Sequence, residues 1–207
     1  MFDVPEGIRA LIFDMDGTLV DSGQLHEFAW TRALERFGLP VDASYMRSLA
    51  GVPSVLTVEM IVERFNIKTF VDPKEVSGFK GKVVDEVIGQ YIKPTALVEL
   101  VRKYNGILPM AVGTGASTSE AKAVLEACGL QNEFACVVGF DQVAHGKPAP
   151  DTFLRCAQLI GVSAAECLVF EDAPHGLVAA ESAGMLAINV ADKFGIINDY
   201  FMKDSFG

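Results

Sequence analysis

The feature that most constrains the fold is a repeated alternation of short apolar runs with segments of helical periodicity. The runs, each only four or five residues long, cover residues 9–13, 108–112, 135–139, 167–170 and 186–190. Between them lie the helix-length segments 95–104, 117–128, 150–160 and 176–183. Because neighbouring parallel strands need a crossover, usually a helix, this order predicts an α/β domain. We therefore expect a doubly wound parallel sheet with helices on both faces.

Residues 24–92 interrupt this alternation with helical patterns alone. One helix is expected over 25–37, a second over 53–65, and a third from Asp72 to Tyr91, begun by a capping Asp and a proline. An insertion that follows the carboxyl end of a strand lies above the ligand crevice of an open α/β sheet. It is therefore a candidate cap or lid. We expect a core made of 1–22 and 94–207, with a helical cap over 23–93.

Charge and composition exclude several classes of partner. Lys and Arg total 17 against 27 for Asp and Glu, a formal charge of −10, which disfavours nucleic-acid and anionic-membrane binding. No apolar run is long enough to span a membrane, and residues 1–6 do not resemble a secretory signal. The four cysteines lack metal-site spacing and are typical of a reduced, cytoplasmic protein. We expect a monomer, with a dimer as the alternative, that acts on a small molecule.

The first apolar run leads directly into two carboxylates, Asp14 and Asp16, followed by Gly17 and Thr18. Gly17 and Thr18 suggest that the chain turns here, which lets both carboxylates face the crevice. Two such groups repel unless a cation joins them or one is protonated, and an oxygen-rich site favours Mg²⁺. An ordinary turn explains the pattern about equally well. A calcium loop does not, because its twelfth position is Leu25 instead of Glu.

Three later segments also place polar residues at the ends of predicted strands. Thr114 and Gly115 precede a helix and could seat a phosphate on free backbone N–H groups. Lys147 lies in a proline-stiffened loop, and the pair 171–172 (Glu-Asp) closes another strand. Each segment alone has an ordinary explanation as a helix start or a surface residue. All these ends share one edge of a parallel sheet, so the combination favours a single site.

These segments resemble the four motifs of the haloacid dehalogenase superfamily of phosphohydrolases in order and spacing: residues 14–18, Thr114, Lys147 and 171–172. The resemblance covers nearly the whole chain and implies a Rossmann-like core. The insertion matches the subclass I cap. Within the superfamily the chain is similar to the β-phosphoglucomutase-like branch. Its amino-acid sequence over 109–115 and 147–153 is most similar to that of small bacterial phosphatases described as acting on fructose 1-phosphate or 6-phosphogluconate.

The resemblance implies a role for each matched residue. Asp14 would be the nucleophile that forms an aspartyl phosphate, and Asp16 the general acid and base. Mg²⁺ would be bound by the Asp14 side chain, the Asp16 backbone carbonyl and Asp172, with Glu171 close by. The phosphoryl group would be held by Thr114, the Gly115 backbone and Lys147.

The insertion supplies three further candidates. His26 falls where the mutase branch carries a histidine beside the acid Asp, although an exposed helix histidine is equally compatible with the pattern. Lys80 lies within the apolar stripe of its helix, where it must meet a charge or reach out to water, and we expect it over the site. Ser54 stands in the loop where mutases carry an arginine for a second phosphate. The sequence therefore predicts a sugar-phosphate phosphatase, with a phosphoglucomutase as the alternative.

The tail after Asn189 is rich in apolar side chains, which are Phe194, Ile196, Ile197, Tyr200 and Phe201. It is consistent with a last helix packed on the core or with a small contact patch.

Overall fold

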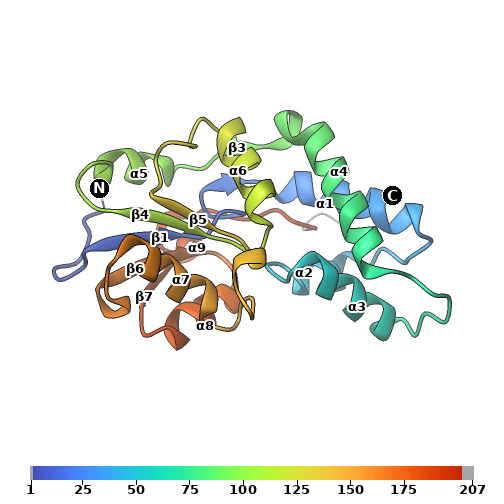
Figure 1. Ribbon diagram of the computed structural model, residues 1–207. Coiled ribbons are helices and arrows are strands. Elements are labelled where there is room, and N and C mark those ends of the chain that lie inside the picture. Colours follow the sequence, from blue (N-terminus) through green and yellow to red (C-terminus); the bar gives the residue numbers. More distant parts are fainter. Residues whose placement is uncertain (1, 202–207) are drawn as a thin grey trace.

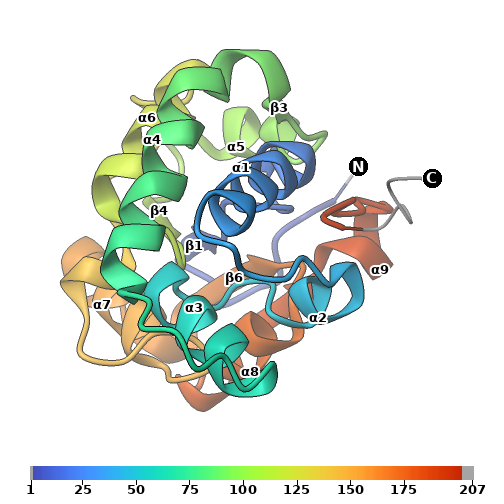
Figure 2. The same ribbon diagram turned by 90° about the vertical axis from the view of Figure 1, so that its right-hand side faces the viewer.

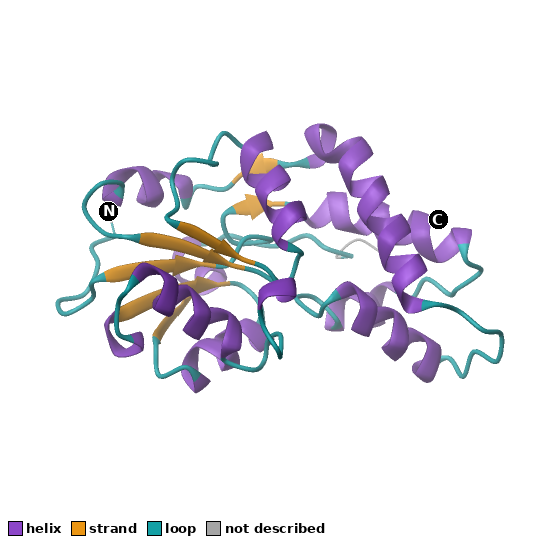
Figure 3. Ribbon diagram, viewed as in Figure 1, coloured by secondary structure: helices purple, strands orange, loops and turns teal. Residues whose placement is uncertain are grey.

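The computed structural model describes residues 2–201, and its centre is the parallel sheet that the alternation predicts. The strands have the spatial order β5-β4-β1-β6-β7, and every neighbouring pair is parallel (Figures 1 and 3). Their bounds are β1 Ala10–Phe13, β4 Met110–Gly113, β5 Cys136–Val138, β6 Cys167–Glu171 and β7 Leu186–Asn189. The predicted α/β fold class is thus confirmed. After β1, the chain adds β4 and β5 on one side of it and then β6 and β7 on the other, so the strand order reverses at β1. Open α/β sheets bind ligands at the carboxyl end of such a reversal point.

Helices cover both faces of this sheet because its strands are apolar on both faces. Leu11 and Phe13 face one hydrophobic cluster, while Ala10 and Ile12 face the other, as the two-residue period of a strand requires. The first cluster is closed by α5 (Val98–Tyr104), α6 (Thr118–Ala127) and α9 (Val190–Phe194). The second is closed by α7 (Asp151–Ile160) and α8 (Pro174–Ser182). Two short 3₁₀ turns, Phe140–Gln142 and Ala164–Glu166, complete this part of the chain.

The helical insertion, residues 23–92, forms a separate group of helices beyond the carboxyl edge of the sheet (Figures 1 and 2). It contains α1 (Gly23–Arg36), α2 (Ala43–Ser48), α3 (Ser54–Arg64) and α4 (Pro73–Tyr91). The Asp72 side chain accepts a hydrogen bond from the Lys74 N–H at the start of α4, as its sequence predicts. Helix α2 was not predicted. Its six residues are too few for a periodic pattern, and its clearest local signal is Asp42, which accepts the Tyr45 N–H.

The two chain crossings between the sheet and the helical insertion lie side by side. Strands β2 (Val20–Asp21) and β3 (Lys93–Pro94) pair in antiparallel fashion, and the Thr95 hydroxyl donates to the Thr18 carbonyl at 2.6 Å. This two-residue ladder was also missed, because two residues carry no alternation to detect. Its effect is to fix the base of the insertion next to Asp14 and Asp16.

The tail agrees in part with the expected last helix packed on the core, since Val190, Phe194 and Ile196 join the first hydrophobic cluster. It begins as the short helix α9 and then leaves the sheet for the helical insertion. There Tyr200 and Phe201 are buried in the same hydrophobic cluster as Trp30 and Met46. Within residues 2–201, no helix has the length and apolar character needed to cross a membrane.

Candidate active site

A cavity of about 100 Å³ lies between the carboxyl edge of the sheet and the helical insertion. One water occupies roughly 10–15 Å³ by the same measure, so there is room for a small polar ligand. Every site residue predicted from the sequence lines this cavity. From the sheet side these are Asp14, Asp16, Thr114, Gly115, Lys147, Glu171 and Asp172, and from the insertion side His26, Ser54 and Lys80.

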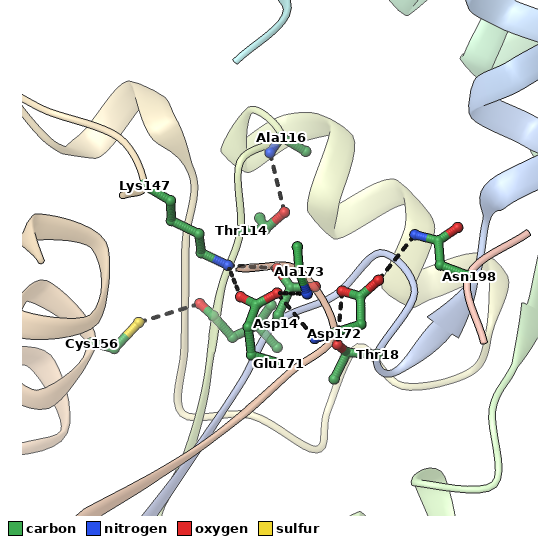
Figure 4. Close-up of polar contacts among 11 residues, drawn as sticks. Asp14, Thr18, Thr114, Ala116, Lys147, Cys156, Glu171, Asp172, Ala173 and Asn198 are labelled. Carbon is green, nitrogen blue, oxygen red and sulfur yellow. Dashed lines mark hydrogen bonds and ion pairs between the residues drawn. The ribbon is translucent and has the colours of Figure 1, made fainter. Parts of the chain in front are cut away.

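Lys147 joins two of the strand ends. Its Nζ lies 2.6 Å from Asp14 Oδ1 and 2.6 Å from Glu171 Oε2 (Figure 4). The three side chains are only 3%, 8% and 1% exposed, respectively. Burial by itself favours a neutral amine, but the two carboxylates outweigh it and raise the pKa of Lys147. The lysine is therefore a fixed positive charge inside the site.

Asp14, Glu171 and Asp172 form a crowded carboxylate cluster. One oxygen from each lies within 4.8 Å of the others. Burial, followed by the charge of Glu171, raises the pKa of Asp14 well above its usual value and that of Asp172 to about 7. With all groups ionised, Lys147 leaves two negative charges in the cluster uncompensated. A hard divalent cation such as Mg²⁺ fits this set of oxygen donors and would offset that charge.

Asp16 has a different environment from Asp14, although only one residue separates them. Its Oδ1 accepts from Ser22 Oγ at 2.5 Å and lies 2.9 Å from His26 Nε2. Burial tends to raise the pKa of Asp16, but His26, Ser22 and the charge of Lys80 outweigh it and lower the pKa to about 2. Ser22 was missed by sequence reasoning, because a serine just before a helix is usually a capping residue.

Two glycines make room for these carboxylates. Gly17 has φ +81°, and a Cβ there would lie 2.3 Å from Asp172 Oδ2. At Gly176, in the first turn of α8, a Cβ would lie 1.8 Å from Glu171 Oε2. Glu171 also accepts the N–H groups of Asp172 and Ala173 at 3.1 and 3.0 Å. Glycine is therefore required where the acidic side chains pack directly against backbone.

Thr114 and Gly115 directly follow the end of β4. The Thr114 hydroxyl accepts the Ala116 N–H at 3.1 Å, and its side chain is buried at the cavity wall (Figure 4). A Cβ on Gly115 would lie 2.7 Å from the Gly51 carbonyl oxygen, so the insertion loop sits directly on this turn. The arrangement gives a small, polar surface at the start of a helix, where anions bind favourably.

On the insertion side, Lys80 is buried in α4, and its Nζ lies 2.8 Å from Glu120 Oε1 of α6. The lysine thus meets a charge, as its position in the apolar stripe requires. Glu120 was not identified from the sequence, since an acidic residue in the first turn of a helix is ordinary. The described residues that line the cavity include no arginine.

Two residues of the tail, Asn198 and Tyr200, also line the cavity and were not predicted. Asn198 Nδ2 donates to Asp172 Oδ2 at 3.2 Å. No motif marks this contact. The available signal was an asparagine between two apolar stretches, which also fits a turn.

Comparisons with known proteins agree with this geometry. A family model described as haloacid dehalogenase-like hydrolase matches residues 8–184. Fructose-1-phosphate phosphatase YqaB of Escherichia coli K12 is 42% identical over 185 residues, covering 89% of this chain and 97% of that protein. A phosphorylated carbohydrates phosphatase of Thermotoga maritima is 31% identical over 180 residues, covering 86% and 82%. β-Phosphoglucomutase from Clostridium difficile shares the fold, with a TM-score of 0.78 at 23% identity over 94% and 97% of the two chains.

Proposed function

Because this chain belongs to the haloacid dehalogenase-like family of hydrolases, we propose that it is a Mg²⁺-dependent phosphatase of small sugar phosphates. Its reaction is hydrolysis of a phosphoric monoester. The observation that carries the proposal is the buried contact of Lys147 with both Asp14 and Glu171, beside Asp172, in a cavity that Thr114 also lines. In this proposal the nucleophile Asp14, the cation Lys147 and the phosphate-binding Thr114 lie within one small volume.

The proposed chemistry begins at Asp14. Its carboxylate attacks phosphorus, an Asp14–phosphorus bond forms, and the bond from phosphorus to the sugar oxygen breaks. The phosphoryl oxygens contact Thr114, the Gly115 N–H and Lys147, which stabilise the charge of the transition state. In the substrate complex a protonated Asp16 donates its proton to the leaving sugar oxygen. The carboxylate that results, which is the form that Ser22 and His26 stabilise in the free protein, later takes a proton from the water that hydrolyses the aspartyl phosphate. Ser22 and His26 hold the Asp16 carboxyl group in place for both proton transfers.

The proposed metal site uses the carboxylates of Asp14, Glu171 and Asp172 together with the backbone carbonyl of Asp16. Bound Mg²⁺ would supply the positive charge that offsets repulsion between these carboxylates and a dianionic phosphate. The two charges that Lys147 leaves uncompensated when all three carboxylates are ionised support this assignment.

The helical insertion serves, in this proposal, as the cap that selects the sugar. His26, Ser54 and Lys80 face the cavity from that side. Because Lys80 is already neutralised by Glu120, the insertion offers little unpaired positive charge to a substrate carboxylate. This supports a neutral sugar such as that of fructose 1-phosphate over 6-phosphogluconate, and agrees with the activity named for the E. coli relative.

The mutase alternative is less well supported. A mutase must hold a bisphosphate in two orientations, and a guanidinium is the side chain best suited to a second phosphate. Ser54 lies in the loop where that group would be needed, and no arginine is among the described cavity residues. Hydrolysis needs only one phosphate seat.

The cysteines support a cytoplasmic location. All four are free thiols, and two of them, Cys156 and Cys167, are buried. Reduced cysteines of this kind are typical of a reducing compartment.

The decisive experiment measures phosphate release from a panel of hexose and pentose phosphates, with Mg²⁺ and with a chelator. We expect Mg²⁺-dependent turnover, highest on fructose 1-phosphate, and none by the Asp14→Asn variant. Protein that binds Mg²⁺ but hydrolyses no ester would overturn the proposal. Conversion of β-glucose 1-phosphate to glucose 6-phosphate without matching free phosphate would establish the mutase instead.

A further inference from the structure

The tail after α9 contacts both sides of the candidate active site. Residues 196–201 run from the edge of the sheet to the helical insertion, and Asn198 and Tyr200 line the cavity between them. The match to the family model ends at residue 184, before this segment begins. That match therefore assigns no role to the tail.

On the sheet side, Asn198 fixes one oxygen of Asp172. Its Nδ2 donates to Asp172 Oδ2 at 3.2 Å, while Thr18 Oγ1 lies 3.4 Å from Oδ1 (Figure 4). The amide also packs closely on the first motif, because a Cβ on Gly17 would lie 2.4 Å from Asn198 Nδ2. Both oxygens of Asp172 thus have a donor, and its carboxylate is held in one orientation beside Asp14 and Glu171.

On the insertion side, the end of the segment is anchored. Tyr200 and Phe201 are only 8% and 3% exposed and pack in the hydrophobic cluster of the insertion. The Phe201 N–H donates to Glu27 Oε2 at 3.0 Å, and its carbonyl accepts from Arg47 Nε at 3.0 Å. These contacts join Phe201 to α1 and α2, and Phe201 lies only three positions after Asn198.

We propose that two residues of the tail belong to the active site, Asn198 as a positioning residue for Asp172 and Tyr200 as a wall of the substrate cavity. The inference rests on the proposed function, in which Asp172 is a metal ligand. Hydrogen bonds to a ligating carboxylate orient it, and their loss commonly weakens metal binding 10–100-fold. Since Phe201 is tied to α1 and α2, the orientation of Asp172 depends on where the helical insertion sits.

The test is a calorimetric titration of the phosphate-free, full-length protein with Mg²⁺. We expect Asn198→Ala, and the volume-matched Asn198→Leu, to raise the Kd for Mg²⁺ about tenfold. Asn198→Gln, which keeps the amide donor, should recover most of the affinity. The matched control is Ile197→Ala, whose side chain is 69% exposed and does not line this cavity. Thermal unfolding without metal checks that each variant is folded.

Steady-state kinetics at saturating Mg²⁺ test Tyr200. We expect Tyr200→Ala to raise KM for the preferred sugar phosphate several-fold while kcat changes little, whereas Ile197→Ala changes neither. Folded Asn198 variants with wild-type Mg²⁺ affinity would overturn the positioning role, and an unchanged KM in Tyr200→Ala would overturn the assignment of the cavity wall. Wild-type protein that binds no Mg²⁺ would instead contradict the proposed function on which the inference rests.

Discussion

The two sides of the cavity are built on different principles. On the sheet side the ionic groups contact one another, because Lys147 bridges Asp14 and Glu171 from neighbouring strand ends. On the insertion side each basic group contacts a carboxylate of the opposite side: His26 contacts Asp16, and Lys80 contacts Glu120. The Lys147 ion pairs of the sheet side therefore need no residue of the insertion, whereas His26 and Lys80 have these ionic partners only when the insertion lies on the core. We expect changes on the sheet side to affect chemistry, and changes on the insertion side to affect recognition.

The largest effect is expected from Asp14→Asn. The amide removes the nucleophile with little change in volume, so kcat should fall by about 10⁴-fold or more. Phosphate release measures the change, and circular dichroism confirms the fold. Residual turnover at the wild-type rate would mean that the activity comes from another protein or that Asp14 is not the nucleophile.

Lys147→Met is expected to have the next largest effect. It keeps the length of the side chain but removes the charge between two buried carboxylates, so kcat should fall by about 10²–10³-fold. Without metal, the free energy of unfolding should fall by about 3 kcal/mol, because Asp14 and Glu171 are left unpaired. Urea unfolding measures this loss, and added Mg²⁺ should restore part of it.

The exposed Lys122, on helix α6, provides the control for that experiment. Lys122→Met should leave both turnover and unfolding close to the wild type. Equal losses in the two variants would show that the buried position of Lys147 has no special importance.

On the insertion side, Lys80→Met should act mainly on recognition. The variant leaves the charge of Glu120 uncompensated next to the cavity wall, which should repel a phosphate ester, so KM should rise about tenfold with a smaller change in kcat. Lys82→Met, two residues along the same helix and exposed, is the matched control. A fall in kcat at unchanged KM would contradict the division of roles between the two sides.

The same division explains what the sequence could predict. Asp14, Thr114, Lys147 and the pair 171–172 each follow or end an apolar run, and parallel topology alone places such ends at one edge. His26 and Lys80, which were singled out by resemblance and by position on a helix, line the same cavity. The local sequence pattern was sufficient to predict a residue's location wherever its place at a strand end or on a helix face determines which way its side chain points.

The partners of these residues could not be predicted. Ser22, Glu120 and Asn198 each contact a site residue that is 6, 40 or 26 positions away in sequence, and nothing in their local sequence indicates that contact. Helix α2 and the β2–β3 ladder were missed for a related reason. Elements this short are stabilised by the surfaces on which they pack more than by local propensity.

The smallest expected effect is that of Gly78→Ala in α4. Together with Gly176→Ala in α8, it compares the two sides through the same chemical change. Gly78 lies inside a helix and a Cβ there would have no atom within 4 Å, so alanine should stabilise the protein by about 0.5–1 kcal/mol. For a chain of this size that corresponds to a thermal midpoint raised by roughly 1–4 °C, with activity unchanged. Gly176→Ala makes the same change in α8, but there the Cβ would meet the Glu171 carboxylate, so both stability and turnover should fall. Similar behaviour of the two alanine variants would show that the sheet side is no more tightly packed than the insertion.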